Sequence, residues 1–568
     1  MKTIVTILGL LLFAMFSSSG ESERSAAQGA GKPNILLILA DDLGWSDMGC
    51  YGGEIKTPNL DALAQDGLRF SQAYNSSRCC PSRASLLTGL YPHQAGIGRF
   101  VGRDTGAPGY RGSLNDNTVT LAEVLKKAGY GTYMVGKWHV NEPGPTKRGF
   151  DEFYGFVHGH GLDSWEPRMM IRLPEGRPQR EYAAGKYFAT DAITDYALDF
   201  LHTAREQKHP WFLYVAYQAP HFPVQAPPEL TETYVSTYEK GWDVLRAERI
   251  ERLKKLGLVP DSLADPGRSP IENIHAARKA GSATPDGKNP AWDSLDPARR
   301  ADLTRRMAVY AAMVENMDAN IGRLIADLRK SGELDNTLIL FLSDNGACAE
   351  WEPFGFDLTA SNYANPKPGH GVDGNTSREP NILYEGEALQ KLGGPGSLFS
   401  YGSGWANLSN TPLWLYKHHA HEGGIRSPMI AHWPARIRDK GAISNQVAHV
   451  IDIMPTALEI AHAYYSSEAP SLEGRSLLPS FNGDAPTSRN IFFEHERNAA
   501  LREGDWKLVG KGALAKEGVR PEVKWELYNL AADPNEQHNL AKSEPDRVKE
   551  MADRLLAEAW RTHALPSP

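Results

Sequence analysis

The chain has 568 residues, which predicts two to four domains, or one large α/β domain with an appendage. A composition of 41% hydrophobic and 23% charged residues is typical of a globular protein and excludes long disorder and a collagen-like repeat. The formal net charge of −8 provides no overall basic field, so we expect no nucleic-acid partner.

The first residues have the pattern of an export signal. Lys2 precedes an apolar run at residues 4–16, and small and polar residues follow. This pattern predicts a signal peptide over residues 1–27 and hence an exported protein, periplasmic or secreted. The alternative is a buried first helix. The run is too short to span a bilayer and no later segment is apolar enough, so no membrane span is expected.

Short apolar runs alternate with helical patterns along most of the chain. Strands are predicted at residues 34–40, 132–135, 210–217 and 337–343, and helices at 57–67, 117–129 and 297–331. Such alternation favours an α/β fold, with a large mixed, mostly parallel sheet flanked by helices. Residues 222–297 are predicted to be a partly helical insertion on the surface, and residues 346–412 a long irregular loop region of the kind that is uncommon unless functional.

The pattern changes near residue 488. Short strands at 491–494, 506–509 and 524–528 precede a helix at 544–559. This order predicts a small C-terminal α+β subdomain with an antiparallel sheet. We therefore expect a catalytic α/β domain over residues 31–480 and the C-terminal subdomain over residues 481–568.

Polar residues follow two of the predicted strands. Asp41 and Asp42 come after the first strand, and Asp344 and Asn345 after a later one. Ligand sites in open α/β sheets form at the carboxyl ends of strands, and four oxygen donors there would suit calcium or magnesium. For each pair alone, the cap of a helix or a turn is the favoured interpretation. Five histidines lack the spacing of a zinc site: His158, His160, His418, His419 and His421.

Cysteine is scarce, and two of the four cysteines, Cys79 and Cys80, are adjacent; the others are Cys50 and Cys348. Cys79 is predicted to lie at a helix N-terminus with Arg78 and Arg83 close by. Both features lower the pKa of a thiol and favour an anion. From the residues alone, two buried cysteines at a helix start would be the favoured interpretation.

The run Cys79-Cys80-Pro81-Ser82-Arg83, followed by Thr88-Gly89, resembles the signature of the sulfatase family, Cys-x-Pro-Ser-Arg-x-x-x-x-Thr-Gly. Cys80 stands where the family commonly has a small or hydroxyl residue. Further family motifs follow in order over residues 33–545: Asp41-Asp42-Leu43-Gly44, Gly136-Lys137-Trp138-His139, Ala219-Pro220-His221-Phe222-Pro223, Ser343-Asp344-Asn345-Gly346, and Lys417 ahead of Glu422-Gly423-Gly424-Ile425-Arg426-Ser427-Pro428. The segment from Trp405 to Lys417 looks most like the bacterial arylsulfatase branch.

The resemblance implies a sulfuric ester hydrolase of arylsulfatase type. A formylglycine-generating enzyme would convert Cys79 into formylglycine (3-oxoalanine), whose gem-diol attacks a sulfate monoester of a small molecule or glycan and forms a covalent sulfo-enzyme intermediate. By resemblance, calcium, less plausibly magnesium, is bound by the residue at position 79 with Asp41, Asp42, Asp344 and Asn345. The implied catalytic residues are Cys79, Arg83, Lys137, His139 as base, and His221 and Lys417, either of which protonates the leaving group.

Two other functions remain as alternatives. Related metal-dependent phosphomonoesterases and phosphodiesterases share the expected sheet but use Ser, Thr or an unmodified Cys, so the Cys79 signature argues against them. A non-catalytic binding protein for sulfated glycans would be expected to lack the nucleophile or the metal ligands, and all of them are present here.

Overall fold

The computed structural model describes residues 31–102, 104–271, 274–350, 353–359, 367–371 and 377–568. The predicted signal peptide lies outside these residues and stays a prediction. Within the described part of the chain, no helix combines the length and the apolar character that a membrane span requires.

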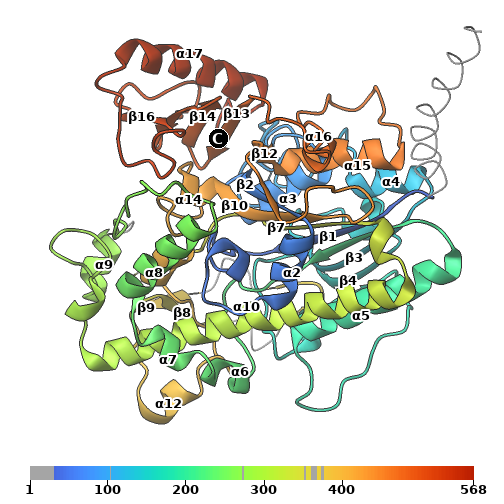
Figure 1. The fold of residues 1–568 in the computed structure, drawn as a ribbon, viewed down its shortest axis with the longest axis horizontal. Coiled ribbons are helices and arrows are strands. Elements are labelled where there is room, and N and C mark those ends of the chain that lie inside the picture. The colour runs from blue at the N-terminus through green and yellow to red at the C-terminus, as the bar shows by residue number, and fades with distance from the viewer. Residues whose placement is uncertain (1–30, 103, 272–273, 351–352, 360–366, 372–376) are drawn as a thin grey trace, which may run out of the picture.

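A ten-stranded sheet forms the centre of the molecule (Figure 1). Its spatial order is β11 (Ala442–Ser444), β2 (Leu68–Tyr74), β10 (Arg426–His432), β7 (Thr337–Ser343), β1 (Asn34–Ala40), β6 (Trp211–Ala216), β3 (Gly131–Lys137), β4 (Glu152–Phe156) and β5 (Ile171–Leu173), while β12 (Ala448–His449) pairs with β2. The strands from β7 to β4 pair in parallel, whereas β10 is antiparallel to both neighbours and β5 to β4. The predicted mixed, mostly parallel sheet is confirmed.

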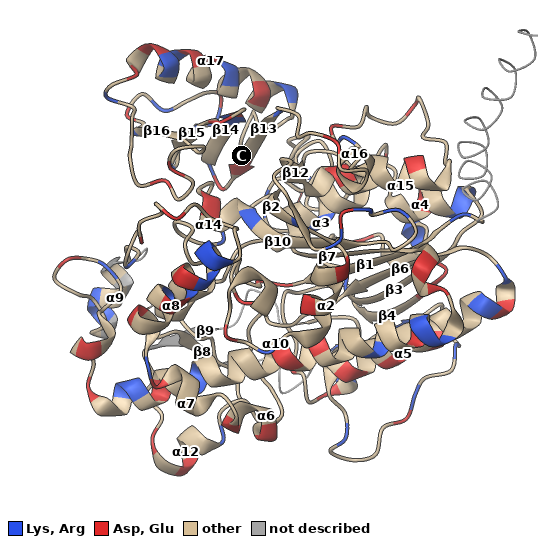
Figure 2. Ribbon diagram, viewed as in Figure 1, with Lys and Arg blue, Asp and Glu red and all other residues tan. Residues whose placement is uncertain are grey.

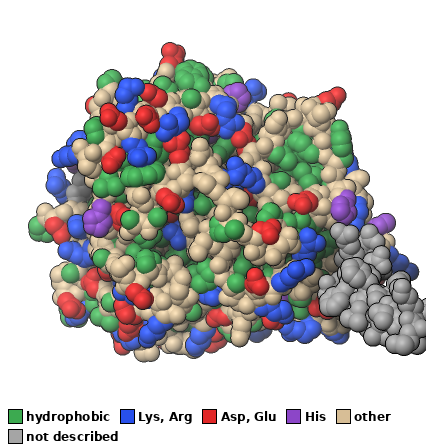
Figure 3. Space-filling view, turned by 45° about the horizontal axis from the view of Figure 1, so that its top comes forward, with side chains coloured by type: hydrophobic (Ala, Val, Ile, Leu, Met, Phe, Trp, Pro, Cys, Tyr) green, Lys and Arg blue, Asp and Glu red, His purple; other side chains and the backbone are tan. Residues whose placement is uncertain are grey.

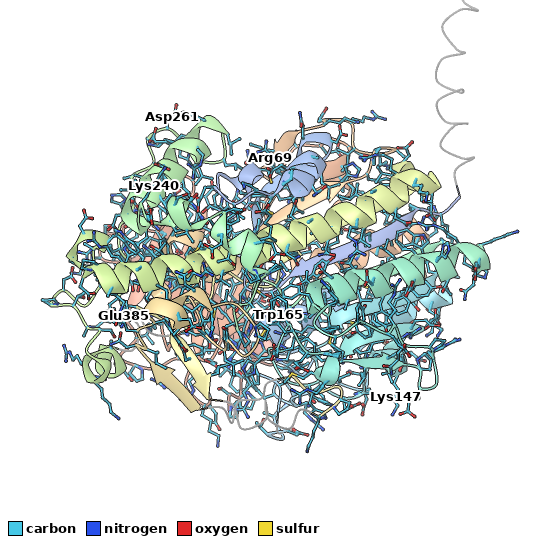
Figure 4. The ribbon with its side chains drawn as sticks, turned by 90° about the horizontal axis from the view of Figure 1, so that it is seen from below. Arg69, Lys147, Trp165, Lys240, Asp261 and Glu385 are labelled. Carbon is cyan, nitrogen blue, oxygen red and sulfur yellow. The ribbon has the colours of Figure 1, made fainter. Side chains whose placement is uncertain are left out.

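Strand β1 shows why the sheet carries helices on both faces. Leu36 and Ile38 enter one core with α2 (Pro58–Asp66), α5 (Ala189–Gln207) and α10 (Pro297–Ser331). Ile35 and Leu37 enter the other with α3 (Cys79–Thr88), α4 (Leu121–Lys127) and α15 (Ile453–Ala461). A strand buried on both faces needs a nearly continuous apolar run. Figure 4 shows α10 and α5 side by side across one face of the sheet.

Helix boundaries follow the capping residues. Helix α10 has the predicted bounds, because Asp296 caps its start with a hydrogen bond from the Arg299 backbone of 2.9 Å and Gly332 ends it with a positive φ of 76°. Helix α4 begins at Leu121, four residues later than predicted. Thr120 and Glu123 form a capping box there, so the chain before Thr120 does not continue the helix.

The segment predicted as a surface insertion contains α6 (Pro228–Glu232), α7 (Val235–Tyr238), α8 (Trp242–Lys255) and α9 (Ile274–Ala280). Its partly helical character is confirmed, and α8 lies at the surface with one face exposed, but its other face is deeply buried. Trp242 packs edge-on against Trp405 at 5.1 Å, and the fully buried Arg249 binds Asp47 at 2.9 Å and Glu54 at 2.7 Å. Two distant carboxylates compensate the buried charge, which no local pattern could reveal.

The long irregular region includes β8 (Phe356–Thr359), β9 (Ser377–Pro380), α12 (Gly386–Gln390) and α13 (Ser403–Ser409). After α14 (Glu422–Ile425) and α16 (Leu478–Phe481), the chain forms a second, antiparallel sheet of β13 (Asn490–His495), β14 (Asn498–Glu503), β15 (Trp506–Gly510) and β16 (Trp525–Asn529). Helix α17 (Pro545–Arg561) covers this sheet (Figure 1). The predicted α+β subdomain is confirmed, while its boundary between residues 480 and 481 stays a prediction.

Surface charge does not gather by sign. Basic and acidic segments alternate along outer helices such as α5 and α17 (Figure 2), and both kinds of side chain are mixed on the face shown in Figure 3. The distinctive charges of the molecule are therefore the buried ones.

Candidate active site

The predicted site residues meet at one edge of the large sheet. Strands β1, β3, β6 and β7 all end there, and the segment before β10 returns to the same edge. The ten side chains lie between 0% and 3% exposed: Asp41, Asp42, Cys79, Arg83, Lys137, His139, His221, Asp344, Asn345 and Lys417. The roles of these residues stay predictions, but the fold gathers them as the motifs require.

Oxygen donors at the ends of β1 and β7 face one another. The Asp42 backbone donates to Asp344 Oδ1 at 3.3 Å, and Asn345 Nδ2 donates to Asp42 Oδ1 at 2.6 Å. Burial, with the neighbouring carboxylates, raises the pKa of Asp41 and of Asp344. Two buried acceptors, Asp41 Oδ1 and Asn345 Oδ1, have no hydrogen-bond partner. Unpaired oxygens among crowded carboxylates fit a hard divalent cation.

Three cationic side chains surround this donor set. Arg83 donates to Asp344 Oδ2 from Nε at 3.0 Å and from Nη2 at 2.8 Å. Lys137 bonds to Asp41 and donates to the His160 carbonyl at 2.7 Å. Lys417 lies 3.0 Å from Asp42. Buried cations beside a buried carboxylate cluster can bind an anion without waiting for solvent to rearrange.

Cys79 is the first residue of α3, as predicted, and only 1% of it is exposed. Its Sγ, Cys80 Sγ and a His139 ring nitrogen lie within 4.8 Å of one another. Burial alone would raise the pKa of the Cys79 thiol, but the hydrogen bond from Cys80, the contact with His139 and the charge of Lys137 outweigh it and hold the pKa well below the ordinary value. Position 79 is thus poised for an anionic or nucleophilic group.

The two predicted histidines are neutral. Burial, aided by Lys137, lowers the pKa of His139 to about 4 and that of His221 well below its ordinary value. Both ring nitrogens of His139 are buried, and the ring interacts with the side chain of Cys79. His221 Nδ1 lies 2.5 Å from the Phe222 carbonyl, to which it donates, so the neutral ring presents an unprotonated Nε2 to the site.

The backbone of the site is held in rarely occupied conformations. Asp42, His139 and His418 have positive φ of 67°, 56° and 75°. Such conformations in residues other than glycine cluster at functional sites. Gly423 allows the loop before Lys417 to approach closely, because a Cβ atom there would lie 2.1 Å from the Leu415 carbonyl oxygen.

Sequence reasoning missed residues that complete the site. Glu350 lies 3.4 Å from Lys417 and 3.3 Å from His418. Phe100 packs edge-on against His139, with ring centroids 5.2 Å apart, and His160 supplies a carbonyl to Lys137. They lie in loops without a local motif, and the unusual length of residues 346–412 was a signal only for the loop that holds Glu350.

Known proteins resemble this chain over most of its length. The family model described as Sulfatase matches residues 33–463, and the one described as N-sulphoglucosamine sulphohydrolase, C-terminal, matches residues 412–562. An uncharacterized sulfatase of Schizosaccharomyces pombe is 35% identical over 94% of this chain and 95% of its own length. The arylsulfatase of Klebsiella aerogenes is 33% identical over 76% of this chain and 87% of its own.

A solved structure also resembles this chain over most of its length. The crystal structure of Ps i-CgsB in complex with k-i-k-neocarrahexaose superimposes with a TM-score of 0.62 and 25% identity, covering 94% of each chain.

Proposed function

This chain belongs to the sulfatase family, and we propose that it is an exported arylsulfatase-type enzyme whose nucleophile is formylglycine made from Cys79 and whose metal is calcium. Membership of this family supports the hydrolysis of sulfate esters as the reaction. The modified residue, the metal identity, the subtype and the export are the proposed part.

One observation carries the site assignment. Unpartnered acceptor oxygens of Asp41 and Asn345 lie in a cluster that also holds three buried cations. A folded protein rarely leaves such oxygens unpaired unless a ligand uses them. Asp41, Asp42, Asp344 and Asn345 would hold the cation, which together with an aldehyde hydrate at position 79 would supply charge neutralisation and a hydroxyl nucleophile.

The remaining residues bind the sulfate and manage protons. Arg83 and Lys137 neutralise negative charge beside position 79, and Lys417 and His221 hold the sulfate group from the Asp42 side. Neutral His139, whose ring lies beside the side chain at position 79, can accept a proton from the group there.

Of the two candidate proton donors to the leaving group, the geometry supports Lys417. His221 donates through Nδ1 to the Phe222 carbonyl, so in its neutral form it has no proton on Nε2 to give. Burial disfavours the charged form of Lys417, but Asp42, Cys348 and Glu350 outweigh this and raise its pKa well above the ordinary value, so it is protonated.

Maturation is proposed to precede folding. Every residue of α3 is buried, and Cys79 is almost completely covered. A formylglycine-generating enzyme could not reach that side chain in the folded state. The conversion is therefore expected on the unfolded or partly folded chain.

The function is tested with protein made in a host that contains a formylglycine-generating enzyme. We expect hydrolysis of 4-nitrophenyl sulfate to disappear after chelation and to return with calcium more fully than with magnesium. Asp41→Asn is the matched control that should not recover. Turnover that survives complete chelation, or a preference for 4-nitrophenyl phosphate, would contradict the proposal and support a phosphoesterase.

A further inference from the structure

A chain of charges leads from the buried site to the surface. It begins at Lys417, passes Glu350 and His418, and reaches Glu496, whose Oε2 lies 3.7 Å from His418 Nδ1. The Glu496 side chain is 46% exposed, whereas those of Lys417, Glu350 and His418 are at most 6% exposed. Glu496 therefore marks the exposed end of this chain of charges, and we call this end the opening of the site.

Glu496 comes from the C-terminal subdomain, in the two-residue turn between β13 and β14. Glu496 and Arg497 both have positive φ, 49° and 72°. Such a turn favours Asn-Gly, so two long side chains are an unfavourable choice for the turn itself. The turn is fixed to the site by a hydrogen bond of 3.2 Å from Asn498 Nδ2 to the His418 carbonyl. This arrangement holds the Glu496 carboxylate at the opening.

Two other side chains complete the opening. Arg78, the residue before Cys79, pairs with Glu496 Oε1 at 2.7 Å and stacks over the Phe100 ring at 4.6 Å. Phe100 is only partly buried, and its ring meets the His139 ring edge-on. A carboxylate, a guanidinium and an aromatic ring thus lie together beside position 79, at the exposed end of the chain of charges.

We infer that Glu496, with Arg78 and Phe100, forms a subsite for the hydroxyl-bearing ring of a sugar sulfate. The carboxylate of Glu496 accepts hydrogen bonds from sugar hydroxyls, Arg78 holds that carboxylate and donates to ring substituents, and Phe100 packs against the apolar face of the ring. A charged acceptor contributes most to a ligand that brings donors, and a simple aryl sulfate brings none. This inference rests on the proposed function and narrows its substrate class to carbohydrate sulfates.

The test compares kcat/KM for N-acetylgalactosamine 6-sulfate and N-acetylglucosamine 6-sulfate with kcat/KM for 4-nitrophenyl sulfate. In Glu496→Gln, which keeps the shape and removes the charge, we expect the sugar-to-aryl ratio to fall at least tenfold. Arg497→Gly is the matched control. It alters the same turn, suits the positive φ and should leave the ratio unchanged. An unchanged ratio in Glu496→Gln, or an equal fall in the control, would overturn the subsite.

A binding measurement separates the subsite from catalysis. In a Cys79→Ala background, Glu496→Gln should weaken the Kd for N-acetylgalactosamine 6-sulfate at least tenfold by calorimetric titration. Equal Kd values, or no binding to either variant, would overturn the subsite. An enzyme active on 4-nitrophenyl sulfate that neither cleaves nor binds the sugar sulfates would disprove the subsite and leave the sulfatase proposal standing. An enzyme inactive on all sulfates would reject the proposed function.

Discussion

One cluster of buried charge lies at the carboxyl edge of the large sheet, and another lies where the four-stranded sheet meets it. In the second cluster, Lys507 sits between Glu422 and Glu536, 2.8 Å from each. The other Glu422 oxygen accepts from the Tyr74 hydroxyl at 2.8 Å, and the other Glu536 oxygen accepts from the Glu422 backbone at 2.7 Å. Every carboxylate oxygen of this cluster has a partner, whereas Asp41 and Asn345 at the sheet edge each keep one that has none.

The pKa values of Glu422 and Asp41 differ in the same way, although burial also raises the pKa of Glu536. Burial raises the pKa of Glu422, but Lys507 and Arg426 outweigh it and bring the pKa below its ordinary value. At Asp41, burial and Asp344 outweigh Lys137 and Arg83, and the pKa is well above its ordinary value. The second cluster, Glu422, Lys507 and Glu536, is called the seam cluster below. Its charged groups are all paired within the protein, so it serves stability. The edge cluster needs a ligand and serves chemistry.

The largest effect is expected at the nucleophile. Cys79→Ala should lower kcat for 4-nitrophenyl sulfate by at least about 10⁴-fold, because no other group at that position can attack sulfur. Cys80→Ser, a change at the adjacent buried thiol, should keep kcat within about tenfold, since no predicted step uses it. An equal loss of activity in the two variants would contradict the assignment of Cys79 as the nucleophile.

The next effect separates activity from stability within the edge cluster. Asp41→Asn should lower kcat by about 10³-fold through loss of a metal ligand. Without metal, however, it should melt no lower than the wild type. Because the folded-state pKa of Asp41 is raised above 3.8, its ionisation costs the metal-free protein stability as pH rises above about 4, and the substitution removes that cost. Thermal melts in chelator at pH 5 and 8 measure this, and a large loss of melting temperature in the variant would contradict it.

A substitution in the seam cluster should have the opposite effect, with a large loss of stability and little loss of activity. Lys507→Met leaves two buried carboxylates without their cation, so the free energy of unfolding should fall by about 3–5 kcal/mol. The kcat of the protein that remains folded should stay within about threefold, since no predicted step involves the seam. Urea unfolding monitored together with turnover checks both. A variant that keeps its stability but loses turnover would reverse the assigned roles.

Removal of the metal should distinguish the two clusters further, through an effect of intermediate size on stability. At calcium about a hundredfold above its Kd, the bound ion should stabilise the native state by about 2.7 kcal/mol. Chelation should therefore lower the melting temperature of wild-type protein and of Lys507→Met, but hardly that of Asp41→Asn. Equal shifts in all three proteins would place the metal elsewhere.

The smallest effect serves as a baseline outside both clusters. Thr120→Ala removes the cap of α4 and a hydrogen bond of 2.8 Å to the Arg148 carbonyl. We expect a loss of about 1–2 kcal/mol in unfolding free energy. Activity per folded molecule and the shift on chelation should match the wild type, and a change in either would mean that stability alone alters the site.

The sequence predicts the elements whose signals are local. Strands β1 and β7 and helix α10 have the predicted bounds, because doubly buried strands read as apolar runs and because Asp296 and Gly332 mark the helix ends. Strand β10 was missed although it lies between two other strands. It contains Pro428, which usually argues against a central strand, and the register shifts between Ser427 and Met429 accommodate it.

The residues of the candidate site also fall into those that the sequence reveals and those that it does not. Its motif residues could be named from the sequence, because they match the ordered motifs of the sulfatase family. Glu350 and Glu496 could not, since their meaning comes from partners such as Lys417 and Arg78 that are far away along the chain. The paired seam of Glu422 and Lys507 was hidden for the same reason.

The central claim is that position 79 carries an aldehyde in the active enzyme. The direct measurement is the mass of the tryptic peptide that contains this residue, from protein made with a formylglycine-generating enzyme. Replacing CH₂SH by CHO makes the peptide about 18 Da lighter than its thiol form, and the share of the lighter peptide should rise in proportion to kcat across preparations. Full activity in a preparation whose peptide retains the intact thiol would contradict the account.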